Sequence, residues 1–195
     1  MQNKNTLVRD LIYIGVFGAV YTILTFIIAF LGYIPVLMPV LPMILTAVLS
    51  IPVFLFYSKI DRPILCCGLF YGLFGFFFFL NGHSPLFLAI IIVGGFLTGI
   101  PMQLMGKSTK SLTISYMISS IIPSSVLLPL WLMTEDYLKM AATFCDQNCV
   151  DFLAAMPEHN WVLPAVYAGG AIGAFIGSLI ARRAMKKHFK KIGLV

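Results

Sequence analysis

Charged side chains are scarce in this chain of 195 residues. Asp, Glu, Lys and Arg make up 10% of it, whereas soluble domains carry roughly 25% charged residues. Hydrophobic residues make up 60%, and the mean hydropathy is +0.98. So few charges cannot cover the surface of a water-soluble domain of this size, which excludes that class of protein. The net charge of +6 does not indicate nucleic-acid binding, because the basic residues lie between apolar runs.

Motifs that carry catalysis or nucleotide hydrolysis are also missing. The chain contains no GxxxxGKS or GxxxxGKT, no HExxH and no GxSxG sequence. Cys66 and Cys67 stand together in an apolar run, without the Cys and His spacing of a zinc site. We therefore expect a protein that is not an enzyme, with no catalytic residue, no metal site and no cofactor.

What the chain does have is six long apolar runs. A helix needs about 20 apolar residues to cross a hydrocarbon core roughly 30 Å thick. The second run contains Pro39, Pro42 and Pro52, which predict kinks because proline donates no backbone hydrogen bond. The sequence therefore predicts an all-α integral membrane protein with a single transmembrane domain over residues 1–195, whose six spans lie at about 11–31, 36–57, 63–80, 85–105, 112–133 and 162–181.

Basic residues fall almost entirely on one side of these spans. If the N-terminus is cytoplasmic, the inner segments hold twelve basic and two acidic residues, a net charge of +10. The outer segments hold one basic residue, Lys139, and five acidic ones, a net charge of −4, and the two sides together give the +6 of the chain. Cytoplasmic loops of membrane proteins carry an excess of Lys and Arg. This pattern predicts a multi-pass protein of the cell membrane with both termini in the cytoplasm.

The six runs themselves contain no Asp, Glu, Lys or Arg. Ionisable residues in membrane spans usually mark proton relays or ion pathways, so their absence argues against a proton-driven carrier. Sodium can still be bound by backbone carbonyls alone. Since the chain also lacks a nucleotide-binding motif, we expect a membrane-embedded binder with no energy source of its own.

Small residues recur at helical spacing in two of the runs. In the first run Gly15 and Ala19 share one face and Gly18 lies beside them, while the sixth run carries a strip that includes Gly173 and Gly177. Small residues at this spacing let helix backbones approach closely in lipid. The strip in the sixth run is typical of packing inside the bundle. The patch in the first run lies near the cytoplasmic side, and it suits internal packing and docking of another membrane protein equally well.

The one long connection, residues 134–161, is predicted on the outer side. Its apolar residues recur at helical spacing, which predicts one or two amphipathic helices on the outer surface. Such an element either caps a pocket or rests on lipid headgroups. Cys145 and Cys149 lie where a disulfide is permitted, but on a continuous helix their Cα atoms would be about 6 Å apart, near the geometric limit. We therefore expect free thiols.

A short polar break from Asn81 to Ser84 separates the third and fourth runs and is predicted to be an outer turn. His83 is then either a solvated loop residue or a polar group that faces a cavity open to the outside. Trp131 and Trp161 are explained by the membrane interface alone, where Trp is enriched. The outer ends of the spans supply the predicted substrate-binding residues, which are Tyr33, Met38, Met43, Phe79, Asn81, His83, Trp131, His159, Asn160, Trp161 and Tyr167.

The chemistry of this set indicates a flat, partly polar ligand. Small-molecule pockets are mostly apolar with a few placed polar groups, and aromatic and Met walls with amide and imidazole groups fit that description. The His and Met residues also leave a haem-like or metal-chelate ligand open. We treat the serines of the fifth run as structural, because hydroxyls within a helix usually bond the preceding turn.

Four stretches taken together resemble a known family. They are the basic start KNTLVRDLIYIGVFGAVY, the first outer turn FLGYIPVLMPVLP, the NGH that follows the third run, and the tail KKHFKKIG. Over nearly its whole length the chain resembles the Trep_Strep group of substrate-binding (S) components of energy-coupling factor (ECF) transporters.

This resemblance implies a bundle of six helices that captures a micronutrient, typically a vitamin or its precursor, near the outer surface. It implies as partners a membrane coupling (T) protein and two cytosolic ATPases, and docking on them would topple the bundle and release the substrate inside. The family's small-residue docking motif in the first helix maps onto Gly15 and Ala19, with Gly in place of the commoner first Ala.

Two other functions are open on the sequence. One is a self-contained secondary carrier or channel, and the other is a scaffold protein without a ligand. A secondary carrier would need inverted repeats and broken helices at the midplane. We find no convincing repeat between residues 1–105 and 106–195, which favours the resemblance.

Overall fold

The computed structural model describes residues 4–189, which form helices and turns with no strand. The predicted all-α class is therefore confirmed over that range. The α-helices are α1 (Lys4–Ala29), α2 (Leu41–Val48), α3 (Ser50–Lys59), α4 (Pro63–Leu80), α5 (Pro85–Met105), α6 (Thr109–Ser119), α7 (Ile121–Ser124), α8 (Leu128–Leu132), α9 (Thr134–Ala141), α10 (Gln147–Ala155) and α11 (Val162–Ala184). The shorter helical turns are η1 (Phe30–Tyr33), η2 (Pro35–Val40), η3 (Ser125–Leu127), η4 (Met156–Glu158) and η5 (Met185–Phe189).

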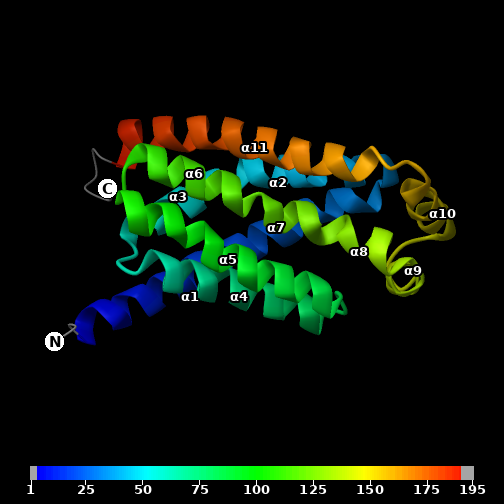
Figure 1. The fold of residues 1–195 in the computed structure, drawn as a ribbon, viewed down its shortest axis with the longest axis horizontal. Coiled ribbons are helices and arrows are strands. Elements are labelled where there is room, and N and C mark those ends of the chain that lie inside the picture. The colour runs from blue at the N-terminus through cyan, green and yellow to red at the C-terminus, as the bar shows by residue number, and fades with distance from the viewer. Residues whose placement is uncertain (1–3, 190–195) are drawn as a thin grey trace.

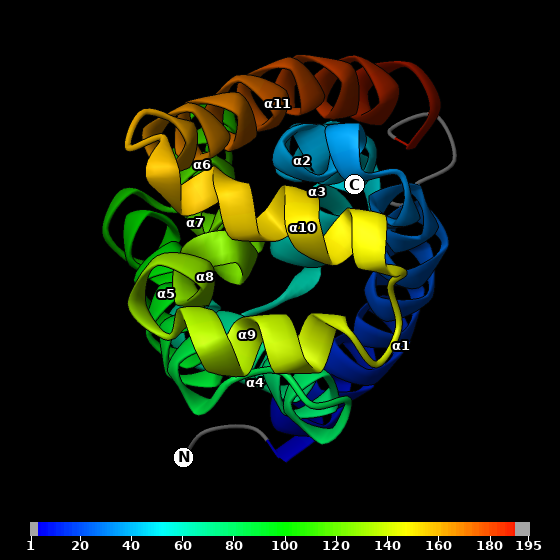
Figure 2. The same cartoon turned by 90° about the vertical axis from the view of Figure 1, so that its right-hand side faces the viewer.

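The helices form an elongated bundle (Figure 1). α1 begins and α11 ends at one end of it, which we call the terminal end. α9 and α10 lie at the opposite end, which we call the capped end. Seen from that end, α9 and α10 lie across the bundle as a lid (Figure 2).

Six helical segments match the six apolar runs. Five are long and apolar enough to cross a membrane, namely Thr6–Tyr33, Pro63–Leu80, Pro85–Met105, Thr109–Leu132 and Val162–Lys187. The sixth is the pair Pro35–Val48 and Ser50–Lys59, which counts as one span if its bend of 45° is included within it. Pro52 explains the bend, because it has no N–H to donate to the Val48 carbonyl and its ring crowds that group. The kink predicted in the second run is therefore present.

Aromatic side chains fill the interior of the bundle between α1, α3, α4 and α6. Tyr21 of α1 packs edge-on against Phe70 and Phe74 of α4, with ring centroids 5.3 Å and 4.9 Å apart. Tyr57 of α3 and Tyr71 of α4 join their hydroxyls in a hydrogen bond of 2.9 Å. Each hydroxyl thereby finds a partner away from water, so wide rings can occupy the interior without leaving a polar group unpaired.

α11 packs closely on α2 through its small residues. A Cβ atom added at Gly173 would overlap the carbonyl oxygen of Met43, and one added at Gly177 would lie 2.7 Å from the carbonyl oxygen of Thr46. The two backbones can approach this far only because these positions lack side chains. The interpretation of this strip as internal packing is confirmed.

Four of the five serines of the fifth span donate to the preceding turn, whereas the buried Ser115 hydroxyl has no hydrogen-bond partner among the described residues. Ser119, Ser120 and Ser124 donate to carbonyls of the preceding turn at 2.7, 2.6 and 2.8 Å. Such bonds satisfy the hydroxyls locally, which agrees with the structural role that we predicted for them.

Candidate functional site

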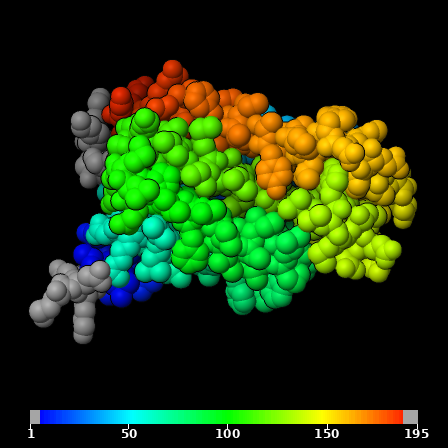
Figure 3. Space-filling view, viewed as in Figure 1, coloured from blue at the N-terminus to red at the C-terminus, as the bar shows by residue number. Residues whose placement is uncertain are grey.

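A cavity of about 220 Å³ lies at the capped end. Its wall comes from the turn between α4 and α5, from η3 and α8, and from α9. In the space-filling view, the green side chains of the α4–α5 region adjoin the yellow-green ones of α8 and α9 (Figure 3). Most of the wall is apolar, and the residues that line it are Gly82, His83, Ser84, Pro85, Phe87, Val126, Pro129, Met133, Asp136, Tyr137 and Met140.

The polar break in the sequence forms the turn on one side of this cavity. Asn81 ends α4 and donates its side-chain amide to the Phe77 carbonyl at 2.8 Å. Gly82 has a φ of +89°, a conformation that costs residues with a side chain more than it costs glycine. Ser84 then caps α5 by accepting the Phe87 N–H at 3.2 Å. These residues reverse the chain within one turn and set His83 in the cavity wall.

His83 is half-buried between aromatic rings. Its ring centroid lies 4.8 Å from that of Phe78 and 5.8 Å from that of Phe87. Burial lowers the pKa of His83 below its ordinary value of 6.5, although the neighbouring backbone carbonyl of Phe78 acts in the opposite direction. The imidazole is therefore neutral at pH 7. Its Nδ1 atom is buried and has no hydrogen-bond partner among the described residues, so a ligand with a polar group would satisfy it.

The facing wall is the inner side of α9. Met133, Asp136, Tyr137 and Met140 follow one another at helical spacing and line the cavity together. Burial raises the pKa of Tyr137 far above its ordinary value of 10, so this hydroxyl keeps its proton. Asp136 is exposed and has no ion-pair partner among the described side chains, those of residues 6–187. The cavity thus contains one carboxylate that no cation neutralises.

The lid has a small apolar core of its own. Leu130 of α8, Tyr137 and Ala141 of α9, and Leu153 of α10 are buried together in it. Met38 and Trp131 pack against this core from its edge. Residues 134–161 form the helices α9 and α10, and apolar residues of both helices are buried in this core.

Our expectation of free thiols in this segment is wrong, because Cys145 and Cys149 form a disulfide with their Cα atoms 5.9 Å apart. The expectation assumed one continuous helix. Instead α9 ends at Ala141, and Asp146 caps a new helix by accepting the Cys149 N–H at 2.9 Å. Cys145 therefore lies in a turn, whose backbone is free to bring the two sulfur atoms together.

Only part of the predicted substrate-binding set lies at the cavity. His83 lines it, and Trp131 lies close by on α8, where its buried Nε1 has no hydrogen-bond partner among the described residues. Tyr167 does not line the cavity, and its hydroxyl shares a hydrogen bond of 2.9 Å with that of Ser125. The remaining predicted residues lie outside the cavity wall, and a role for them in binding stays a prediction: half-buried are Met38 and Met43, and exposed are Tyr33, Phe79, Asn81, His159, Asn160 and Trp161.

Sequence reasoning missed the α9 wall. Met133, Asp136 or Tyr137, and Met140 are spaced three or four residues apart, which is the signature of one helix face. That signature was visible in the sequence, but it did not show that this face would turn toward the α4–α5 turn.

The structure separates the three predicted docking residues. Gly15 and Ala19 are exposed on α1, and a Cβ atom added at Gly15 would meet nothing within 4 Å. Gly18 is buried, and a Cβ atom there would lie 3.8 Å from the Leu73 side chain. Gly18 therefore serves packing of α1 on α4, while Gly15 and Ala19 form an open patch of small residues.

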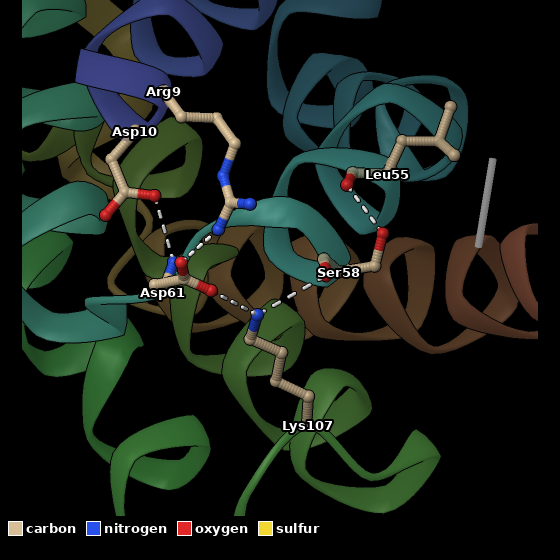
Figure 4. A network of polar contacts seen from close by, with 6 residues as sticks. All are labelled: Arg9, Asp10, Leu55, Ser58, Asp61 and Lys107. Carbon is tan, nitrogen blue, oxygen red and sulfur yellow. Dashed lines mark hydrogen bonds and ion pairs between the residues drawn. The ribbon is translucent and has the colours of Figure 1, made fainter. Parts of the chain in front are cut away.

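Charged residues gather at the terminal end (Figure 4). Asp61, between α3 and α4, pairs with Arg9 of α1, and its Oδ1 lies 3.6 Å from Lys107 Nζ. Asp10 accepts the backbone N–H of Asp61 at 3.0 Å. Lys107 also donates to the Ser58 carbonyl at 3.5 Å. This network ties α1 to the α3–α4 and α5–α6 connections. No group of three or more His, Cys, Asp or Glu within residues 6–187, whose side chains the structure describes, is arranged to hold a metal ion.

Comparison with known proteins gives one match. No curated protein and no solved structure is significantly similar to the chain. The family model of Trep_Strep, described as a hypothetical bacterial integral membrane protein, matches residues 8–191. This match spans α1 through the end of α11 and includes both the cavity and the small-residue patch. The chain therefore belongs to the Trep_Strep family of bacterial integral membrane proteins.

Proposed function

We propose that this protein is the substrate-capturing subunit of an ECF-type importer. In this proposal the cavity at the capped end binds a micronutrient, such as a vitamin or a cofactor precursor, from the outside. The loaded bundle then docks on a membrane coupling protein that carries two cytosolic ATPases. The protein itself performs no chemistry and hydrolyses no nucleotide.

The observation that carries the proposal is the contrast between the covered cavity and the filled interior. The cavity lies under α9 at the capped end, while Tyr21, Tyr57, Phe70 and Tyr71 occupy the interior of the bundle. A solute bound under the lid meets these side chains in place of a passage. This supports a subunit that captures its solute and depends on a partner for release, over a carrier that conducts through its own centre.

Charge supports the orientation that the proposal requires. The terminal end carries Arg9 and Lys107, whereas residues 134–161 of the capped end hold five acids and one base. Basic residues concentrate on the cytoplasmic side of membrane proteins. We therefore propose that both termini are cytoplasmic and that the lid faces outward.

The open patch at Gly15 and Ala19 supports docking on α1. Both positions are exposed and lie within the first span, Gly15 nearer to its terminal end and Ala19 at its middle. Since apolar burial contributes little between helices in lipid, close packing of small residues is what favours association there. A helix of the coupling protein would approach the α1 backbone at this patch.

Co-purification tests this proposal directly. A tagged chain should bring down a membrane coupling protein and two ATPases from its native membrane. Gly15→Leu and Ala19→Leu should abolish that association and solute uptake, because each adds a side chain where two helices meet. Ala89→Leu is the matched control, since Ala89 is exposed on α5 and its enlargement should leave association unchanged.

Two results would contradict the proposed function. One is normal uptake by the Gly15→Leu and Ala19→Leu variants. The other is continuous uptake against a gradient by the purified chain alone in liposomes, which would identify a self-contained secondary carrier.

A further inference from the structure

The cavity at the capped end contains acceptors of hydrogen bonds but no cation. Among its lining residues Asp136 is the only one with an acidic side chain, while no Lys or Arg takes part in the lining. Lys139 belongs to the same helix but does not line the cavity. A ligand that enters therefore meets an unneutralised carboxylate.

The surface around the cavity has the same sign of charge. Residues 134–161 contain Glu135, Asp136, Asp146, Asp151 and Glu158 against Lys139 alone, a net charge of −4. A surface of one sign raises the local concentration of ligands of the opposite sign. Both the near charge at Asp136 and the wider field thus favour a cation over an anion.

The remaining wall accommodates an apolar ring. Phe87 and Tyr137 contribute aromatic rings, and Met133 and Met140 contribute flexible thioethers. Aromatic faces attract cations, and Met side chains adapt to flat apolar groups. Across the cavity from α9, His83 offers a buried Nδ1 that has no partner among the described residues.

The volume limits the size of the ligand. Pockets for drug-sized ligands measure roughly 300–1,000 Å³, and this cavity measures about 220 Å³. A single aromatic ring with a short side arm suits this space, whereas a haem-like macrocycle would require the lid to move away.

We propose that the cavity binds a small aromatic amine in its protonated form, with the ammonium group on Asp136, the ring between Phe87 and Met140, and a polar ring substituent against His83. This names the substrate class of the importer subunit proposed above and rests on that proposal for its physiological meaning. The binding itself requires only this chain.

The test measures binding to the purified, full-length chain in nanodiscs. The probes are benzylamine, benzyl alcohol and benzoate, which have similar shapes and carry positive, zero and negative charge. Isothermal calorimetry and thermal shift should both rank benzylamine as the tightest binder. Added salt should weaken the binding of benzylamine and leave the binding of benzyl alcohol unchanged, because ions screen only the interaction between charged groups.

Two neighbouring carboxylates provide matched variants. Asp136→Asn should lower the affinity for benzylamine about tenfold, since it removes a charge-assisted hydrogen bond. Glu135→Gln removes the same charge from the adjacent residue of α9, which does not line the cavity, and should weaken benzylamine much less. His83→Gln provides a second readout from the opposite wall and should reduce stabilisation by a ring-aminated probe, 4-aminobenzylamine, more than that by benzylamine.

Three outcomes would overturn the inference. The first is equal affinity for benzylamine and benzyl alcohol. The second is an equal loss of benzylamine affinity in Asp136→Asn and Glu135→Gln. The third is the absence of measurable stabilisation by benzylamine at millimolar concentration. Any of them can occur while the chain still co-purifies with its coupling protein and ATPases. Conversely, selective amine binding by a chain that recruits no ATPase would leave this site standing and remove the importer function.

Discussion

Carboxylates at the two ends of the bundle are treated differently. At the terminal end Asp61 is engaged by Arg9, by Lys107 and, through its backbone, by Asp10. At the capped end Asp136 has no ion-pair partner among the side chains of residues 6–187 and borders a cavity. Paired charges hold chain segments together, whereas an unpaired charge beside a cavity is available to a ligand. We therefore assign a structural role, which is to hold helices together, to the charged groups of the terminal end, and ligand binding to the capped end.

Among the substitutions that test this comparison, we expect the largest effect on stability at Asp10. Asp10→Ala removes the acceptor of the part-buried Asp61 N–H, and a donor left without a partner away from water costs about 1–3 kcal/mol of the free energy of unfolding. Asp10→Asn keeps a carbonyl acceptor and should lose less of the free energy of unfolding. Thermal unfolding in detergent measures both, and benzylamine affinity should stay at the wild-type value. A stable Asp10→Ala chain with impaired ligand binding would reverse the roles of the two ends.

A more local effect is expected from the disulfide in the lid. Closing a ring of a few residues contributes about 2 kcal/mol in the chain-entropy account, so Cys145→Ser with Cys149→Ser should loosen the lid by about that amount. Hydrogen exchange should speed up in α9 and α10 and stay unchanged in α4. Reductant should reproduce the change in the wild-type chain and add nothing in the double variant; uniform acceleration over all helices would contradict a local role.

The smallest effect concerns the pH dependence of stability. Burial lowers the pKa of His83 from 6.5, so the folded protein disfavours its protonated form. The corresponding stability is present above about pH 6.5 and is lost as the pH falls through the lowered pKa of the folded state. His83→Gln should flatten the fall of the melting temperature between about pH 7 and about pH 5. His159→Gln, at an exposed position of the lid, should keep the wild-type slope; equal slopes in all three proteins would exclude His83 as the cause.

The spans could be predicted from sequence because local signals mark their ends. α4 and α5 begin at Pro63 and Pro85, and prolines suit the first turn of a helix, where a backbone N–H has no helical partner. Asn81, Gly82 and Ser84 mark the turn between them with residues that end a helix, reverse the chain and cap the next helix. These are properties of neighbouring residues, and they need no knowledge of the remote chain.

The cavity could be predicted only in part because its walls meet through tertiary packing. His83 stood out as a polar residue in an apolar stretch. Asp136 and Tyr137 lie about 50 residues further along, and they reach the cavity only because α9 folds back over the bundle. The direction of that fold depends on the burial of Leu130, Ala141 and Leu153 in one cluster, which no local pattern fixes.

The bridge between Cys145 and Cys149 also bears on how the protein is made. Its two partners are four residues apart, so it can close as soon as this short segment meets an oxidant, without waiting for the helices to assemble. Synthesis in a reducing mixture would yield chains whose spans are inserted but whose disulfide between α9 and α10 has not formed. With the segment outside the cell, as we propose, the compartment itself supplies the finishing step in maturation of the lid.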